Sequence, residues 1–267
     1  MTTWLEELAD RYLFTGRLVM ESGLHIGGGR DTLTTTDSAV MKYIDDRPYI
    51  PGSSMKGAFR SAVERACAAL PEVRSCGLFA QNDTGCPTAK GLGEDATTIS
   101  DEELEKLCVS CRVFGSIYMA GKVRFSDLQV IPETWAGLTE VRDGVGIDRD
   151  SECAVPRIKY DYEVVPSETA FEFRLIVENP NEAKRELALI VIGLRELEAG
   201  MISIGGIRTR GLGRCRLVGL SAYHLDFNAA DKLKAYLKTG SLETDAFRLS
   251  QDEMQRLLDR QIDRLFA

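Results

Sequence analysis

Four of the seven cysteines have the types and spacing of a metal site. Cys108 and Cys111 form a CxxC pair, and Cys76 and Cys86 lie upstream, beside or within a glycine-rich stretch. Tetrahedral zinc uses a CxxC corner together with two further ligands that a loop brings close. A stretch with few apolar residues can hold its shape through such a metal. The pattern predicts structural Zn2+, and four reduced thiols without a metal are the alternative.

A carboxylate is the second candidate for chemistry. Asp37 stands in the stretch TTTDSAV, shortly after a glycine-rich loop. Beside a phosphate-holding loop, such a group can bind a magnesium ion or steer a nucleophile. The alternative is a loop aspartate that makes local hydrogen bonds. Other catalytic signatures are scarce, because the chain has only two histidines, His25 and His224, and no GxSxG or HExxH motif.

Two glycine-rich loops are candidate phosphate contacts. The first, residues 23–31, carries His25, and the second, residues 205–213, alternates glycines with Arg208 and Arg210. Glycine lets backbone amides approach an anion closely, and arginine pairs with phosphate. Tight turns with solvated arginines are the alternative. The glycines that we single out are Gly27, Gly28, Gly205, Gly206 and Gly211.

The stretch PGSSMKGAFR predicts the start of a helix, with Ser53 or Ser54 as N-cap. Lys56 and Arg60 are four residues apart and would share one face near that end. A helix N-terminus attracts phosphate through free N–H groups and the helix dipole. An ordinary capped helix with two solvated cations is the alternative.

Composition limits the classes of function. The chain has 267 residues and a net charge of −8, which argues against nucleic-acid binding through overall charge but leaves room for a local basic groove. There is no apolar run of the roughly 18–20 residues that a membrane span needs, and the amino terminus lacks a signal layout. We therefore expect a soluble, cytoplasmic protein with no membrane partner.

These residues must be positioned by a mixed α+β fold. Strand patterns occur at residues 14–20, 122–131, 171–177 and 214–220, with helices following residue 53 and over 182–198. This order suits a ferredoxin-like sheet. Residues 141–165 have little core pattern and predict a long protruding hairpin or loop. Two further helical stretches are expected after residue 229.

Several motifs occur together in an order that resembles the RAMP superfamily. They are GLHIGGG, TTTDSAV, YIPGSSMKGAFR, CRVFGS and GGIRTRGLGRCRL, spread over residues 23–217. More narrowly, the chain looks like the repeated backbone subunits of type III CRISPR effector complexes. Its cysteine-bearing insertion resembles members from type III-D-like systems, and the stretch VGIDRDSECAV with YDYEVVP looks like the family's thumb hairpin.

The resemblance implies an α+β, ferredoxin-like (RRM-like) palm with a thumb β-hairpin, a cysteine-rich zinc-binding insertion and a helical C-terminal extension. The RAMP domain would span residues 1–223, with the insertion at about 72–115 and the thumb at about 141–165, and the extension would span 224–267. Guide-RNA phosphates would lie near His25, Ser53, Ser54, Lys56, Arg60 and the 205–211 loop. The thumb, near Ile147 and Arg157, would wedge the guide–target duplex.

In active members an aspartate in the position of Asp37 is needed for target RNA cleavage. The resemblance thus implies a metal-dependent endoribonuclease that uses Mg2+ (or Mn2+), with guide CRISPR RNA, single-stranded target RNA and neighbouring effector subunits as partners. Two alternatives are a non-catalytic scaffold subunit and a stand-alone endoribonuclease that processes guide RNA. Such processing enzymes often rely on histidine, which is scarce here.

Overall fold

A four-stranded antiparallel sheet forms the centre of the protein. The computed structural model describes residues 7–28, 37–70, 73, 75–76, 86 and 101–266, without the side chains of residues 101, 103, 156 and 157. The strand order is β3-β7-β1-β8, and each neighbouring pair is antiparallel. The strands are β1 (Asp10–Met20), β3 (Val123–Phe125), β7 (Ala170–Glu178) and β8 (Cys215–Asp226). Both central strands are therefore paired along both edges.

Alternating side chains give the sheet one apolar face. In β7, Phe171, Phe173 and Leu175 are buried, while Glu172 is exposed, as a strand with period two requires. The predicted strand at residues 171–177 is confirmed. The strand predicted at 14–20 also forms, and it begins earlier, at Asp10, where it pairs with the end of β8.

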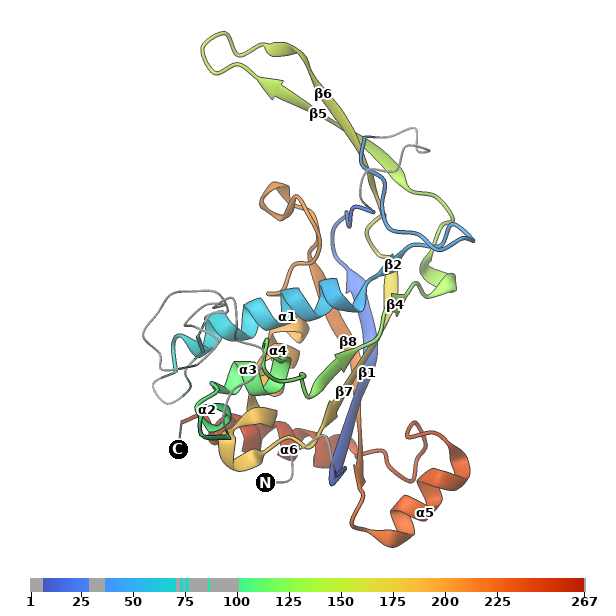
Figure 1. Ribbon diagram of the computed structural model, residues 1–267. Helices are drawn as coiled ribbons and strands as arrows, with labels where there is room; N and C mark the ends of the chain where they lie inside the picture. Colours follow the sequence, from blue (N-terminus) through green and yellow to red (C-terminus); the bar gives the residue numbers. More distant parts are fainter. Residues whose placement is uncertain are drawn as a thin grey trace.

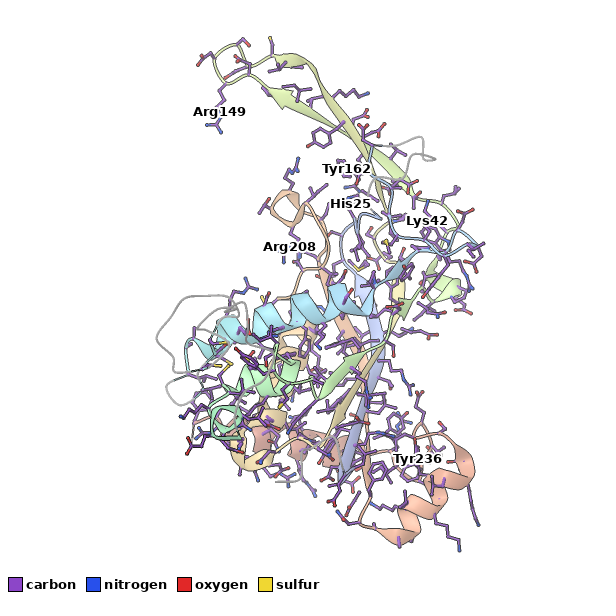
Figure 2. All side chains as sticks on the ribbon, in the orientation of Figure 1. His25, Lys42, Arg149, Tyr162, Arg208 and Tyr236 are labelled. Atoms are coloured by element: carbon purple, nitrogen blue, oxygen red, sulfur yellow. The ribbon has the colours of Figure 1, made fainter. Side chains whose placement is uncertain are left out.

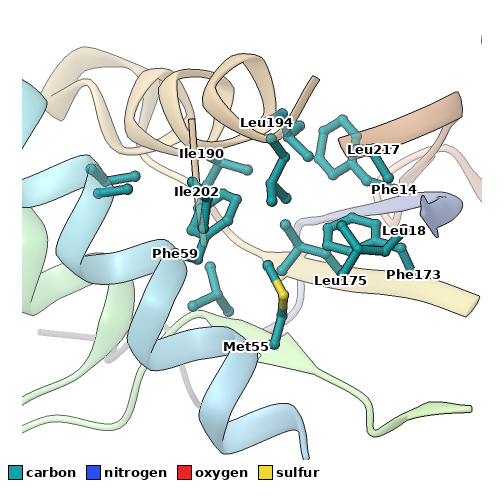
Figure 3. Close-up of a cluster of buried hydrophobic side chains, with 14 of the residues drawn as sticks. Phe14, Leu18, Met55, Phe59, Phe173, Leu175, Ile190, Leu194, Ile202 and Leu217 are labelled. Carbon is teal, nitrogen blue, oxygen red and sulfur yellow. The ribbon is translucent and has the colours of Figure 1, made fainter. Parts of the chain in front are cut away.

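Helices α1 (Gly52–Cys67), α4 (Glu186–Glu198) and α6 (Gln251–Asp263) pack on this apolar face (Figure 1). Figure 3 shows Phe59 of α1 and Leu194 of α4 within the same cluster of buried side chains. No helix among the described residues is long and apolar enough to cross a membrane.

The C-terminal segment after residue 229 packs against the rest of the fold. Side chains Met254, Leu257 and Leu258 of α6 belong to the main core. A capping box at Ser250 starts α6, where a serine hydroxyl satisfies a free N–H. Helix α5 (Ala230–Thr239) packs beside β8 in a smaller cluster made by Leu13, Leu225, Leu242 and Phe247. The expected boundary at residue 223 falls inside β8, which runs to Asp226.

A two-stranded hairpin extends away from the body of the molecule (Figure 1). It consists of β5 (Glu140–Ile147) and β6 (Ala154–Val164), in the segment expected to protrude. Several of its apolar side chains are exposed, namely Val141, Val145, Ile147 and Ile158.

Two elements differ from the sequence prediction. Residues 122–131 do not form one strand, because the chain breaks into β3 and β4 (Leu128–Gln129), and β4 pairs with β2 (Tyr49–Ile50) in a separate sheet. Asp127, at the break, accepts a hydrogen bond from the Gly52 N–H at 2.7 Å. The helix expected over 182–198 begins at Glu186. The remaining elements are α2 (Asp101–Glu105), α3 (Val109–Phe114) and the 3-10 turns η2 (Pro132–Thr134), η3 (Glu182–Lys184) and η4 (Arg208–Arg210).

Candidate functional site

His25 lies at the base of the hairpin, where several segments meet (Figure 2). It is only 7% exposed. Its Nδ1 lies 2.7 Å from the Glu163 carbonyl oxygen, and its Nε2 lies 3.3 Å from the Ser38 hydroxyl. A carbonyl can only accept, so Nδ1 carries the proton and, in the neutral ring, Nε2 accepts from Ser38. The edge of the ring contacts Tyr162, with ring centroids 5.6 Å apart.

The two glycine-rich loops meet at the backbone of His25. Its carbonyl oxygen accepts a hydrogen bond from the Gly206 N–H at 2.8 Å. Gly205 has a φ of +85°, and a Cβ at this position would lie 2.3 Å from the same oxygen. Only glycine fits such a backbone conformation at such a close approach. The structure therefore brings the predicted residues His25, Gly205 and Gly206 together.

The segment that carries Asp37 is fastened on two sides. On one side it pairs with the first glycine loop, through a bridge between Gly27 and Val40 and a 3.0 Å bond from the Gly28 N–H to the Ala39 carbonyl. On the other side it lies along β6, where the Glu163 carboxylate accepts from the Val40 N–H at 3.1 Å. The same carboxylate forms a 3.1 Å ion pair with Lys42.

Asp37 is exposed at the start of this segment. Its Oδ2 accepts a hydrogen bond from the Asp161 N–H at 3.1 Å. Among the described residues, none donates a hydrogen bond to its Oδ1. One carboxylate oxygen of Asp37 is thus held by the backbone of β6.

The second glycine loop presents its arginines differently. The Arg210 guanidinium hydrogen-bonds the Tyr160 hydroxyl of β6 and lies over the ring, 5.9 Å from its centroid. Arg208 is exposed (Figure 2). With Arg65 of α1, it lines a hollow of about 500 Å3. Gly211, with a φ of +91°, ends the turn that carries both arginines. The loop therefore adds cationic groups above α1.

The N-terminus of α1 has free donors. Pro51 is the N-cap and no side chain caps the helix, so the prediction that Ser53 or Ser54 is the N-cap was wrong. Gly52 starts the helix, bonded to Asp127. The backbone N–H groups of Ser53 and Ser54 have no acceptor among the described residues, which leaves them able to bind an anion.

Lys56 and Arg60 lie further along α1 in different surroundings. Partial burial, and the positive charge of Arg60, lower the pKa of Lys56. The Arg60 side chain is 13% exposed and pairs with Glu64 at 2.8 Å. It also donates to the Gly115 carbonyl at 2.9 Å and lies 3.9 Å from the Cys111 Sγ. Arg60 therefore links α1 to the cysteine-bearing segment.

The hairpin carries the last two predicted RNA contacts. Ile147, at the end of β5, is 62% exposed and pairs with Ala154 of β6. Arg157 belongs to β6, and its side chain lies outside the described residues.

The four candidate metal ligands converge. The Sγ atoms of Cys76, Cys86, Cys108 and Cys111 lie within 4.8 Å of one another, and three of the four residues are buried. The Cys76 and Cys111 sulfurs are 3.5 Å apart. Ligands at about 2.3 Å from a tetrahedral zinc stand about 3.8 Å from each other. The donor set and its spacing thus fit zinc.

Contacts among the four cysteines lower the pKa of two of their thiols and raise the pKa of a third. Hydrogen bonding with the Cys111 side chain lowers the pKa of Cys108 to about 7. Hydrogen bonding with the Cys108 side chain lowers the pKa of Cys86 and raises that of Cys76. Because the thiolate is the form that binds metal, a site that contains low-pKa cysteines is chemically suited to it. No disulfide joins any of the seven cysteines, all of which are described.

Several residues of the site had not been singled out in the sequence. Asp161 and Glu163 alternate with Tyr160 and Tyr162 in the stretch YDYEVV. This period of two was a usable signal, because it places the two acids on one side of a strand and the two tyrosines on the other. The segment was predicted to protrude, and no role was predicted for residues 160–163 at its base.

Comparisons with known proteins agree on one family. A family model described as RAMP superfamily matches residues 17–216. Three relatives share the name CRISPR system Cms endoribonuclease Csm3. The one from Enterococcus italicus is 30% identical over 76% of this chain and 87% of its own length. The one from Methanothermobacter thermautotrophicus is 28% identical over 76% and 82%, and the one from Streptococcus thermophilus 26% over 78% and 88%. The chain therefore belongs to the RAMP superfamily.

Proposed function

We propose that this chain is a guide-RNA-binding backbone subunit of a type III CRISPR effector complex in the cytoplasm, and that it cleaves complementary target RNA. The observation that carries the proposal is the similarity, over three quarters of the chain, to relatives named as CRISPR endoribonucleases. Asp37 supplies a matching reactive group, since it is exposed and has one carboxylate oxygen without a donor among the described residues.

The guide RNA runs along one edge of the molecule. Free N–H groups at Ser53 and Ser54 and the exposed guanidinium of Arg208 suit phosphate, and the hollow beside α1 gives a backbone room to pass. Lys56 lies on the same helix, and a bound phosphate would favour its charged form. His25 acts indirectly, by holding the two glycine loops together. These local groups reconcile RNA binding with a net charge of −8.

The scaffold for this edge is a ferredoxin-like palm. The support is the chain order β1, α1, β3, β7, α4, β8 combined with the sheet order β3-β7-β1-β8. The projecting hairpin is the thumb. Its exposed Ile147 and Val145 are suited to wedging between stacked bases of the guide–target duplex, while the body contacts neighbouring subunits.

The reaction is an intramolecular transesterification at a phosphodiester of the target strand. The ribose 2′-oxygen attacks the adjacent phosphorus, a P–O2′ bond forms and the P–O5′ bond breaks. The products carry a 2′,3′-cyclic phosphate and a 5′-hydroxyl. Asp37 assists by taking the 2′-hydroxyl proton, and the leaving 5′-oxygen takes a proton from water; alternatively, Asp37 would be the residue that holds Mg2+ (or Mn2+). A bound divalent ion would stabilise charge on the phosphate.

Zinc has a structural role in this proposal. Cys76, Cys86, Cys108 and Cys111 would hold it, and it would stabilise the packing of these four cysteines. Arg60 lies beside this cluster, where its positive charge offsets the negative charge of the thiolates.

Cleavage of a modified target tests the proposal. The complex is purified with its guide RNA and offered, with magnesium, a complementary RNA and the same RNA with a single 2′-deoxynucleotide at the cut site. We expect cuts in the first and none at the modified position in the second. Equal cutting of both would contradict the attack by the 2′-oxygen, and no cutting of either would contradict the nuclease assignment.

A further inference from the structure

Asp37 and Asp161 hold each other through two reciprocal hydrogen bonds. The Asp161 Oδ1 accepts from the Asp37 N–H at 2.7 Å, and the Asp37 Oδ2 accepts from the Asp161 N–H at 3.1 Å. The two residues are 124 positions apart in the chain. We infer that Asp161 is a positioning residue that fixes the reactive carboxylate of Asp37, an inference that rests on the proposed function.

Strand β6, which carries Asp161, contacts the segment of Asp37 at several points. Residues Ser38 and Tyr162 form a parallel bridge, and the Glu163 N–H donates to the Ser38 carbonyl at 2.9 Å. Asp161 and Glu163 are two residues apart on β6, so their side chains point to the same side. Both carboxylates accept backbone N–H groups of the segment that begins at Asp37. β6 therefore serves as the template for this segment.

β6 holds Ser38 through the bridge to Tyr162 and holds Asp37 itself through Asp161. Beyond Ser38, the Glu163 carboxylate and the first glycine loop hold the backbone. Among the described residues, Asp161 is the one whose side chain hydrogen-bonds Asp37. Its loss would leave the Asp37 N–H without that acceptor and let the backbone turn, and the carboxylate would move with it.

The inferred role needs an acceptor and does not need a negative charge. An asparagine at 161 keeps a side-chain oxygen in the position of Oδ1, so it can still accept from the Asp37 N–H. An alanine removes the acceptor. Placing a catalytic group about 1 Å away from its productive position can cost about 100-fold in rate. A surface hydrogen bond contributes only about 1 kcal/mol to stability, so the fold should survive either change.

The test is single-turnover cleavage of target RNA by the whole complex, loaded with guide RNA. The variants are Asp161→Ala, Asp161→Asn and Asp37→Ala. The matched control is Asp143→Ala, because Asp143 lies opposite Asp161 on β5, pairs with Lys159 and does not contact Asp37. Guide RNA content and target affinity are measured on the same samples.

We expect Asp161→Ala to slow cleavage about 10- to 100-fold with target affinity unchanged. Asp161→Asn and Asp143→Ala should stay within about threefold of wild type. If Asp161→Ala complexes fail to assemble, Asp161→Ser replaces that variant. The serine oxygen stands one bond closer to the backbone than Oδ1, so it should not reach the Asp37 N–H, and we expect the same slowing of cleavage.

Two results would overturn the inference while the proposed function stands. One is wild-type cleavage by Asp161→Ala beside an inactive Asp37→Ala. The other is an Asp161→Asn variant as slow as Asp161→Ala, which would mean that charge, not the hydrogen bond, matters. Wild-type cleavage by Asp37→Ala would instead reject Asp37 as the reactive group and the inference with it.

Discussion

The contact between the two glycine loops can be tested with a pair of glycines. Gly205 and Gly211 both have φ values in the left-handed region, +85° and +91°. A Cβ on Gly205 would meet the His25 carbonyl oxygen at 2.3 Å, whereas a Cβ on Gly211 would meet nothing within 4 Å. Replacing either by alanine therefore puts an L side chain at a positive φ, and only the first change also pushes the loops apart.

The two variants should differ in how much they lower the free energy of unfolding. Left-handed backbone costs alanine about 1–2 kcal/mol, and the stiffer unfolded chain returns about 0.4–1 kcal/mol. Gly211→Ala should thus cost about 1 kcal/mol. Gly205→Ala adds the loss of the Gly206–His25 hydrogen bond, about 1 kcal/mol, and overpacking of about 1–3 kcal/mol. We expect it to cost about 3–5 kcal/mol.

Urea unfolding of the full-length variants measures this difference, since the midpoint reports stability when the slope is unchanged. Gly205→Ala should unfold at a clearly lower urea concentration than Gly211→Ala. Equal midpoints would refute the reasoning, because they would mean that the loops do not pack at His25 as described.

Three further predictions concern the cysteine cluster and the core. Cys111→Ser should lose bound zinc in a metal assay of the purified protein, whereas Cys153→Ser, an exposed cysteine outside the cluster, should retain it; equal zinc content would contradict the site. Arg60→Gln should weaken zinc retention about 10-fold in chelator competition, because a neighbour of the ligands tunes affinity; unchanged retention would count against that role. Glu186→Gln should destabilise the fold by about 3–5 kcal/mol, because it removes the negative charge that lies 2.6 Å from the buried Lys122 ammonium, and Lys122→Met combined with Glu186→Leu should recover most of the loss in thermal unfolding; a Glu186→Gln variant as stable as wild type would contradict the role of this charge.

The parts of the fold that follow local patterns could be predicted from the sequence. Residues 171–177 alternate with period two, and residues 186–198 repeat at helical spacing, so their buried faces could be read directly. The division of residues 122–131 could not, because Asp127 breaks the strand in order to bond Gly52, which is 75 residues away in sequence. Such a contact leaves no periodic signal.

The candidate site could also be predicted only in part. The CxxC pair Cys108–Cys111 indicated a metal, and the structure brings Cys76 and Cys86 to it. Arg60 was grouped with the phosphate-facing residues by helical spacing. Spacing could not show that its guanidinium turns toward Cys111 and Gly115, because that depends on a contact between residues more than 50 positions apart in the sequence.

The sequence also did not indicate the role of residues 160–163 of β6. Acids at alternate positions on an exposed strand are usually solvated, and nothing local indicates that one of them holds Asp37. The pairing joins segments separated by 124 positions, so only the three-dimensional arrangement reveals it.

The most direct test of the central claim is target RNA cleavage by the assembled complex with magnesium, comparing wild type with Asp37→Ala. We predict that the variant keeps its guide RNA and its target affinity and loses cleavage. Unchanged cleavage would contradict the account and would leave this chain as a scaffold, with the active site in another subunit.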